Sequence, residues 1–228
     1  MLRVISSMAT RHLLTELGSA FSAASPGAEV SVISMGGVDA AKRVAAGEPC
    51  DAVVLASGAL DQLITQGHVL AGSRVDVVNS SMAVAVRTGD PRPAVDTEDA
   101  VRQAVLAAAR IGYSTGPSGN HLLALLERWG ITAAVKEKLV QAPPGIPVAS
   151  LVANGDVTVG FQQLSELLNV EGVDVLGLLP AALQGTTTFS GGVARVSMQA
   201  ARARELLAFM ASPATAAIKR QHGMEPAG

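Results

Sequence analysis

The 228-residue chain has few of the residue types that several classes of function require. Cys50 is the single cysteine, which excludes an internal disulfide and a cysteine-ligated metal site. Aromatic residues make up 3% of the sequence, so the stacking surfaces that single-stranded nucleic acids and sugar rings need are scarce. Charged residues make up 16%, the formal net charge is −2, and no block of Lys or Arg occurs. We therefore predict no binding to nucleic acid.

Long apolar runs are also missing, although 49% of the residues are hydrophobic and the mean hydropathy is +0.36. Gly, Ser or a charged residue interrupts each run well before the ~20 residues that span a bilayer, so we predict no membrane insertion. The histidines are scattered without metal-ligand spacing, and we expect neither a metal nor a cofactor. The sequence as written starts with a predicted strand and shows no signal peptide. We expect a cytoplasmic protein if the chain is complete as written, and a periplasmic one if a signal peptide was removed.

The chain contains a series of strand–loop–helix units with small residues in their loops. Three such units open the sequence, with strands predicted at 2–6, 29–33 and 52–56, and helices at 8–24, 38–47 and 59–66. The candidate ligand contacts in these loops are Ser6, Ser7, Gly36, Gly37 and Ser57. Consecutive units of this kind predict a parallel sheet whose ligand-binding edge lies at the carboxyl ends of its strands.

A fourth unit, IGYSTGPSGNHLLALLERWGI at 111–131, carries the strongest site signal. A Gly/Pro/Ser loop turns a short strand into a helix, whose unpaired amide hydrogens and partial positive charge predict an anion site. The candidate contacts here are Ser114, Ser118, Gly119, Asn120 and His121, of which only His121 is titratable. The structural alternative is that Ser118 caps the helix and Gly119 forms a turn.

The remaining segments predict a discontinuous arrangement of two lobes. Extended crossings near residues 80 and 185 separate lobe 1, residues 1–82 and 187–228, from lobe 2, residues 83–186. Further strands are expected at 157–161, 173–178 and 192–196, with helices at 96–109, 147–154, 164–168 and 200–222, and a short helix or turn at 135–140. Gln162 and Gln163 interrupt an apolar strand-to-helix passage. These amides need partners, either from a ligand or from the protein.

Five blocks of the sequence resemble the bacterial molybdate-binding proteins and their relatives, which are type II periplasmic solute-binding proteins of ABC importers. The blocks are LRVISSMATRHLLTEL, AAKRVAAGEPCDAVVLAS, GPSGNHLLALLERWGI, LVANGDVTVGFQQLSEL and SPATAAIKRQHGMEP. The resemblance covers nearly the whole chain. It implies an α/β fold of two lobes joined by two hinge strands, a small anionic ligand held between them, and an ABC importer membrane subunit as a possible partner.

Several site positions depart from the molybdate pattern. Ser6 or Ser7 matches the serine that the family places in the first loop, but the second-loop serine falls on Gly36 or Gly37. The position of the family's tyrosine hydroxyl falls on Gln163. Arg11 and His121 add charged donors, which suit a carboxylate better than a tetrahedral oxyanion. We therefore expect a small carboxylate rather than molybdate, bound by hinge closure of the lobes.

Two other functions stay open at this point. Some relatives of the group are isomerases of small tricarboxylates, such as aconitate isomerase, in which a proton shift moves a double bond. In that case His121 is the candidate base, and Arg11 with the loop amides holds the carboxylates. A ligand-sensing domain of a regulator is the third possibility, but the sequence shows no pair of DNA-binding helices.

Overall fold

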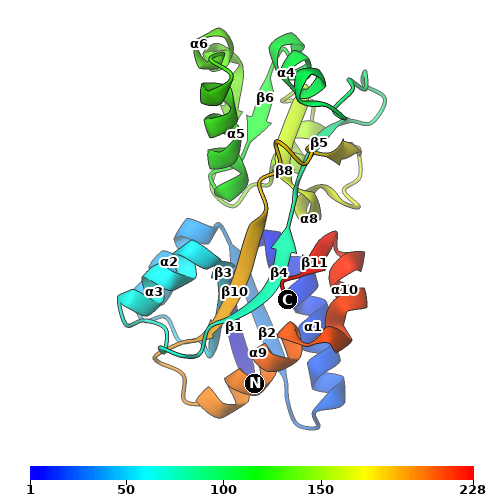
Figure 1. The fold of residues 1–228 in the computed structure, drawn as a ribbon. Helices are drawn as coiled ribbons and strands as arrows, with labels where there is room; N and C mark the ends of the chain where they lie inside the picture. The colour runs from blue at the N-terminus through cyan, green and yellow to red at the C-terminus, as the bar shows by residue number, and fades with distance from the viewer. The chain divides into compact units, whose positions relative to one another are not determined.

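The computed structural model describes all residues from Met1 to Gly228 and divides into two compact units. Unit 1 comprises Met1–Ser80 and Thr187–Gly228, and unit 2 comprises Ser81–Thr186. The chain therefore passes between the units twice, after β4 (Val75–Ser80) and before β10 (Thr187–Val193). Each unit has its own β-sheet covered by helices (Figure 1). This organisation confirms the predicted α/β class.

The six-stranded sheet of unit 1 has the order β11-β4-β10-β3-β1-β2. Its other strands are β1 (Leu2–Ser7), β2 (Val30–Met35), β3 (Ala52–Ala56) and β11 (Met224–Pro226). β1 pairs in parallel with β2 and β3, and β10 is antiparallel to both β3 and β4. β4 therefore runs in the same direction as β1, β2 and β3. The carboxyl ends of these four strands lie at one edge of the sheet, which we call the unit 1 edge.

Two hydrophobic cores cover the two faces of this sheet. The helices of unit 1 are η1 (Met8–Thr10), α1 (Arg11–Ala24), α2 (Gly37–Ala45), α3 (Ser57–Thr65), α9 (Ala200–Ala211), η3 (Pro213–Thr215) and α10 (Ala216–Gln221). Leu14 of α1 and Leu207 of α9 share a core with Val4, whereas Leu60 of α3 shares the other core with Ile5. Consecutive strand residues point to opposite faces, which is why Val4 and Ile5 enter different cores.

The five-stranded sheet of unit 2 has the order β7-β6-β8-β5-β9. Its strands are β5 (Met82–Arg87), β6 (Ile111–Tyr113), β7 (Leu139–Gln141), β8 (Val159–Gln163) and β9 (Val173–Leu178). β6 is parallel to β7 and β8, and β5 is antiparallel to β8 and β9. The carboxyl ends of β6, β7, β8 and β9 thus lie at one edge, which we call the unit 2 edge.

The helices of unit 2 pack on both faces of its sheet. They are α4 (Glu98–Ala107), α5 (Pro117–Arg128), α6 (Thr132–Val135), η2 (Lys136–Lys138), α7 (Val148–Ala153) and α8 (Leu164–Leu167). Leu122 of α5 shares a core with Phe161, whereas Ala149 of α7 and Leu167 of α8 share another with Ala83. The side chain of Thr97 accepts a hydrogen bond from the amide of Ala100, as expected for the cap of α4.

The structure corrects the sequence-based assignment at several strands. The strand predicted at 192–196 is wrong, because β10 spans 187–193. Gly191, which precedes the predicted strand, and Gly192 both lie within β10, where the space of a Cβ is already filled. A Cβ on Gly191 would lie 2.5 Å from Leu207, and one on Gly192 would lie 2.6 Å from Val69. β8 extends to Gln163 instead of ending at 161, and the three-residue strands β7 and β11 were not predicted.

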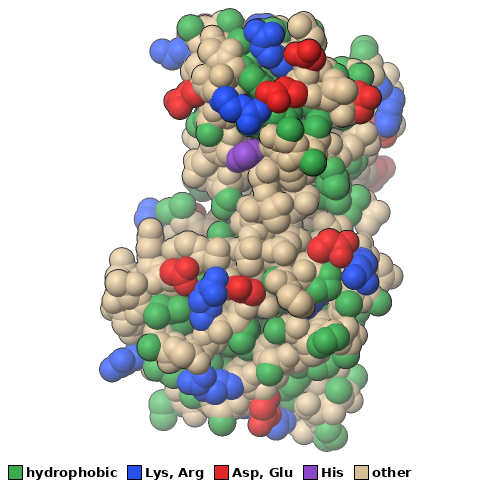
Figure 2. Space-filling model, in the orientation of Figure 1, with side chains coloured by type: hydrophobic (Ala, Val, Ile, Leu, Met, Phe, Trp, Pro, Cys, Tyr) green, Lys and Arg blue, Asp and Glu red, His purple; other side chains and the backbone are tan.

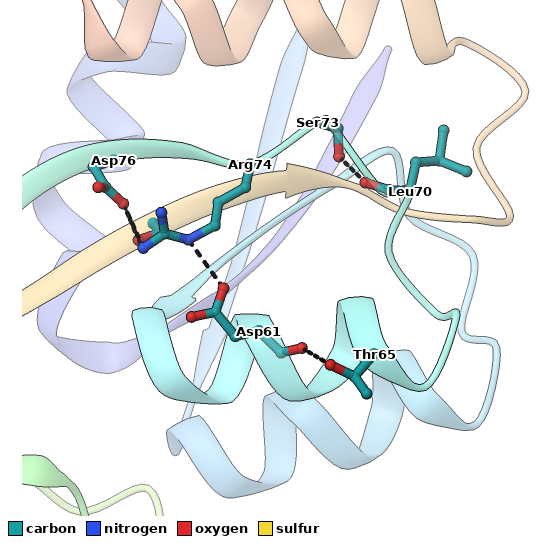
Figure 3. Close-up of polar contacts among 7 residues, drawn as sticks. Asp61, Thr65, Leu70, Ser73, Arg74 and Asp76 are labelled. Carbon is teal, nitrogen blue, oxygen red and sulfur yellow. Dashed lines mark hydrogen bonds and ion pairs between the residues drawn. The ribbon is translucent and has the colours of Figure 1, made fainter.

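An ion-pair network holds the amino-terminal end of β4 (Figure 3). The Arg74 guanidinium lies 3.0 Å from a carboxylate oxygen of Asp61 in α3 and 2.9 Å from one of Asp76 in β4. The Ser190 hydroxyl of β10 donates a hydrogen bond to Asp76. This network lies where the pairing of β4 with β10 shifts register, after Phe189. It therefore ties α3, β4 and β10 together at the end of β4 opposite to the unit 1 edge.

The charged side chains form no large patch on the face drawn in Figure 2. Lys and Arg are interspersed with Asp and Glu there, without a continuous block of one sign. No helix has the length and the apolar character that crossing a membrane requires.

Candidate functional site

The register of β1, β2 and β3 brings the predicted unit 1 contacts to the unit 1 edge. Ser7, the last residue of β1, pairs with Met35, the last of β2. Gly36 and Gly37 follow directly at the start of α2, and Ser57 begins α3 straight after β3. Small residues therefore follow three neighbouring parallel strands at one edge, as the sequence predicted.

Ser6 and Ser7 have different environments at the end of β1. Ser6 Oγ lies 2.7 Å from Ser34 Oγ, so each hydroxyl has a partner. Ser7 is only 7% exposed, and its Oγ atom is buried without a hydrogen-bond partner. Its Cβ lies 3.8 Å from the position of a Cβ on Gly37, which places Ser7 beside the start of α2. A buried hydroxyl without a partner costs about 1–3 kcal/mol, so Ser7 gains from a ligand that hydrogen-bonds to it.

Arg11 is the predicted cation of this edge. It is the first residue of α1, is exposed, and forms no ion pair with an acidic side chain. The first turns of α1 and α3 contain no acidic residue, whereas that of α2 contains Asp39. Asp39 already compensates the partial positive charge of α2. A negatively charged ligand is therefore better accommodated beside α1 and α3.

Ser80 is a candidate that the sequence interpretation missed. It ends β4 at the unit 1 edge, is fully buried, and its hydroxyl has no hydrogen-bond partner. From the sequence, only an extended crossing was placed near residue 80, and no ligand contact was assigned there. The signal that identifies Ser80 is the one that identified Ser7, namely a serine at the carboxyl end of an apolar strand.

In unit 2, the loop between β6 and α5 contains a pair of hydroxyl groups that bond each other. Ser114 Oγ lies 2.9 Å from Ser118 Oγ and accepts a hydrogen bond of 3.2 Å from the Gly116 amide. Whichever hydroxyl donates within the pair, the hydrogen of the other is left available. The pair thus keeps one donor for a ligand. Ser118 does not cap α5, because the N-cap is Gly116 and no side chain caps it, so that structural alternative is wrong.

Gly119 has a packing role at the start of α5. A Cβ on Gly119 would lie 1.8 Å from the carbonyl oxygen of Ser114, which no side chain tolerates. The Gly119 and Asn120 amides both donate to the Gly116 carbonyl, over 3.1 and 3.2 Å. Gly119 therefore lies inside the helix, where close approach to the end of β6 requires glycine. Asn120, the next predicted contact, is exposed.

Gln162 and Gln163 end β8, next to β6 at the unit 2 edge. Gln162 Oε1 accepts a hydrogen bond of 3.2 Å from the Ala149 amide of α7, and its side chain also bonds Glu166. Protein partners therefore occupy both ends of this amide. Gln163 pairs with Met82 and, by alternation, lies on the face that α5 covers.

Glu166 of α8 is an ionisable group beside this edge that the sequence interpretation missed. Burial raises the pKa of its carboxyl group to about 7, and the hydrogen bond from Gln162 opposes this rise. Glu166 is the one acid in the apolar stretch LSELL, which is the signal that marks it. A carboxyl group of this kind exchanges its proton near neutral pH.

His121 is half-buried in the first half of α5. Its Nε2 atom lies 2.7 Å from the carbonyl oxygen of Leu183, in the segment that leads back to β10. No group of three or more His, Cys, Asp or Glu side chains is placed to hold a metal ion. Cys50 is buried, and burial, with smaller effects of Asp51 and Glu48, raises the pKa of its thiol to about 11. The thiol is therefore protonated and unreactive at neutral pH.

Two α/β units, one inserted into the other, with polar loops at the carboxyl ends of parallel strands, define the fold of the type II periplasmic binding proteins. The periplasmic molybdate-binding protein of Azotobacter vinelandii matches 98% of this chain and 98% of its own, with a TM-score of 0.82 and 20% identity. The sulfate-binding protein SubI of Mycobacterium tuberculosis H37Rv matches 99% of this chain and 86% of its own, with a TM-score of 0.80 and 18% identity.

The sequence identifies the family more closely. The model of the family described as bacterial extracellular solute-binding protein matches residues 2–225, and this chain belongs to that family. A relative from Pseudomonas sp, described as aconitate isomerase, is 38% identical over 185 residues, which are 81% of this chain and 70% of the relative. The resemblance that the sequence showed is thereby confirmed.

Proposed function

We propose that this protein binds a small carboxylate anion reversibly outside the cytoplasmic membrane, as the periplasmic solute-binding subunit of an ABC importer. The observation that carries this proposal is the buried Ser7 hydroxyl, which ends β1 without a hydrogen-bond partner. Arg11, exposed and without an ion pair, supplies a cation one 3₁₀ turn further along the chain. A cation that donates several hydrogen bonds suits a carboxylate better than a tetrahedral oxyanion, which neutral groups can hold.

A thermal-shift experiment with defined anions tests this function. The panel comprises molybdate, tungstate, sulfate, succinate, citrate and the two aconitates. A ligand present at about 100 times its Kd stabilises the folded state by about 2.7 kcal/mol, which raises the melting temperature by several degrees. We expect a rise with one or more carboxylates and none with molybdate or tungstate. A rise with the metal oxyanions alone would contradict the choice of ligand.

Two variants connect the binding to the unit 1 edge. Ser7→Ala removes the unpartnered hydroxyl and is expected to weaken carboxylate binding about tenfold, the effect of losing one hydrogen bond to a charged group. Ser19→Ala is the matched control, because Ser19 is exposed in α1 and donates to the Thr15 carbonyl. Equal affinities of Ser7→Ala and the unchanged protein, measured by calorimetry, would show that the ligand does not contact this edge.

A second function, isomerisation of a small unsaturated tricarboxylate, is favoured by the 38% identity to the relative described as aconitate isomerase. The chemistry needs a base for an acidic C–H group and donors for the charge that develops. His121 and the hydroxyl pair of Ser114 and Ser118 lie on the same loop and helix, and supply both kinds of group. Proton NMR of trans-aconitate with the protein in deuterated water tests it. Formation of the cis isomer or deuterium incorporation supports turnover, and binding without either contradicts it.

A further inference from the structure

The ring of His121 is held in one orientation and one tautomer. Nε2 lies 2.7 Å from the Leu183 carbonyl oxygen. Because a carbonyl oxygen only accepts hydrogen bonds, Nε2 carries the hydrogen. In the neutral ring the lone pair then resides on Nδ1, for which the structure shows no hydrogen-bond partner. The contact thus leaves the basic nitrogen of His121 unoccupied.

Gly185 provides a second constraint on the same ring. A Cβ at this position would lie 2.6 Å from Cγ, 2.7 Å from Cδ2 and 2.9 Å from Nδ1 of His121. The backbone of Gly185 does not adopt the left-handed conformation, so the glycine is not needed for a turn. It is needed because the imidazole ring occupies the space of its side chain. A hydrogen bond on one nitrogen and a glycine backbone against the ring therefore fix His121 independently.

Gln184, between these two residues, anchors the segment that carries them. Its Oε1 atom accepts a hydrogen bond of 2.7 Å from the Met82 amide. Its Nε2 atom donates to the carbonyl oxygens of Met82 and Leu179, each over 3.1 Å. The side chain thus occupies both backbone groups of Met82, at the start of β5. The Leu183 carbonyl therefore belongs to a segment with its own fixed position, as a rigid orienting group for a base requires.

We propose that Nδ1 of His121 is the base that carries the proton in the 1,3-shift of an aconitate-type tricarboxylate, and that Leu183 and Gly185 are its positioning residues. This inference rests on the second proposed function. Nδ1 takes a proton from the methylene carbon beside a carboxylate, and the C–H electron pair forms the new double bond. The electron pair of the old double bond then takes the proton back from Nδ1 at the other end of the three-carbon unit. Protons and electrons balance without a co-reactant.

The surroundings of His121 suit this chemistry. During the shift, negative charge spreads from the reacting carbons onto the adjoining carboxylates. The start of α5 has no acidic residue in its first turn, and the Ser114–Ser118 pair retains one donor hydrogen. Both features stabilise an anion that lies beside the first turn of the helix. The imidazolium formed by proton uptake keeps its Nε2 hydrogen bond to Leu183.

His121→Gln is the sharpest test of the base. The glutamine amide nitrogen takes the place of Nε2 and retains a donor for the Leu183 carbonyl, whereas the lone pair of Nδ1 is lost. We expect turnover of trans-aconitate to fall at least about 100-fold, with binding and melting temperature close to those of the unchanged protein. The matched control is His12→Gln, at an exposed position in α1, which should leave turnover unchanged. If His121→Gln is poorly folded, His121→Ala with and without added imidazole replaces it, and imidazole should restore part of the turnover.

Gly185→Ala tests the positioning role. The added methyl group displaces the ring, so kcat should fall by more than about tenfold while KM changes little. Nitrogen-15 NMR should show a mixture of His121 tautomers in this variant and a single one in the unchanged protein.

Two outcomes overturn the inference and are distinguishable. If the unchanged protein isomerises aconitate and His121→Gln retains more than a tenth of that turnover, the isomerase function stands and the base is another group. If the unchanged protein binds trans-aconitate with neither formation of the cis isomer nor deuterium incorporation, the isomerase function and its base both fail.

Discussion

At the end of β1 in unit 1, a buried hydroxyl has no partner, whereas at the end of β6 in unit 2 the hydroxyls bond each other. Ser7 Oγ is the unpartnered atom, and Ser114 and Ser118 form the pair. A group without a partner gains a complete hydrogen bond from a ligand, while a paired group is held in position before the ligand arrives. Under the proposed functions, we expect Ser7 to contribute binding energy and the Ser114–Ser118 pair to contribute preorganised geometry.

The two units differ in a second way, because burial shifts the pKa of a basic side chain in unit 1 and of an acidic side chain in unit 2. Lys219 of α10 in unit 1 is fully buried, and its Nζ atom has no hydrogen-bond partner. Glu166 of α8 in unit 2 is hydrogen-bonded by Gln162. Burial lowers the pKa of Lys219 and raises that of Glu166. The stability of the protein therefore depends on pH through different groups in the two units.

The largest effect should come from Gly119, near the start of α5. Gly119→Ala places a methyl group 1.8 Å from the Ser114 carbonyl oxygen, a clash with backbone that the helix relieves only by moving. We expect the free energy of unfolding to fall by about 3 kcal/mol or more. Gly37→Ala is the control, because its methyl group would have only ordinary contact with Ser7, at 3.8 Å, and should change stability by less than about 1 kcal/mol. Chemical denaturation of both variants measures the difference, and equal losses would contradict the packing role of Gly119.

The next effect concerns Glu166 and the pH range below neutrality. Its pKa rises from the ordinary value of 4.5 to about 7, so the folded state binds the proton more tightly than the unfolded state. Stability should therefore fall as pH rises from 4.5 to 7, by up to about 3 kcal/mol, and be constant with respect to this group above 7. In Glu166→Gln this fall should disappear, whereas it should persist in Glu171→Gln, an exposed control. Urea unfolding at several pH values measures it, and parallel profiles for both variants would refute the assignment.

Lys219 should have a smaller effect at higher pH. Its folded-state pKa lies below the ordinary 10.5, so the folded state binds fewer protons than the unfolded one between these values. The penalty is fully present below the folded-state pKa and is lost as pH rises to 10.5. Lys219→Met should therefore stabilise the protein at pH 7 by about 1–2 kcal/mol. The gain should shrink towards pH 10, and Lys42→Met, at an exposed position, should show none. A less stable Lys219→Met variant would contradict this prediction, because it would mean that the ammonium group makes a stabilising interaction in the folded protein.

Much of the fold and of the edge residues could be predicted from local pattern. β3 was predicted with the bounds that the structure shows, because its apolar run ends at Ser57 and Gly58. β10 was misplaced because its two glycines are explained by packing and not by a turn. Leu207 and Val69, which are distant in sequence, fill the space that side chains at Gly191 and Gly192 would need. Periodicity carries no information on such long-range packing.

The candidate site also contains features that the local sequence predicts and features that depend on long-range contacts. Residues of one loop, such as Ser114 and Ser118, were found together because the chain itself places them together. The contact of His121 with Leu183 and Gly185 joins segments about 60 residues apart, and the sequence around each segment contains no pattern that predicts it. Whether a hydroxyl is partnered, as Ser6 is and Ser7 is not, depends on which face of the strand it occupies.

The smallest expected effect on stability is the most informative about the two edges. Ser7→Ala removes a buried polar atom that has no partner, but the void it leaves offsets part of the gain, so the free energy of unfolding without ligand should be unchanged or rise by less than about 1 kcal/mol. Ser118→Ala breaks the bond with Ser114 and should lower it by about 1 kcal/mol. With a carboxylate present, Ser7→Ala should instead be less stable than the unchanged protein, because it loses the stabilisation that the ligand gives. Thermal unfolding with and without trans-aconitate measures both quantities. A destabilised Ser7→Ala in the absence of ligand would mean that its hydroxyl has a structural partner, and the contrast between the units would then disappear.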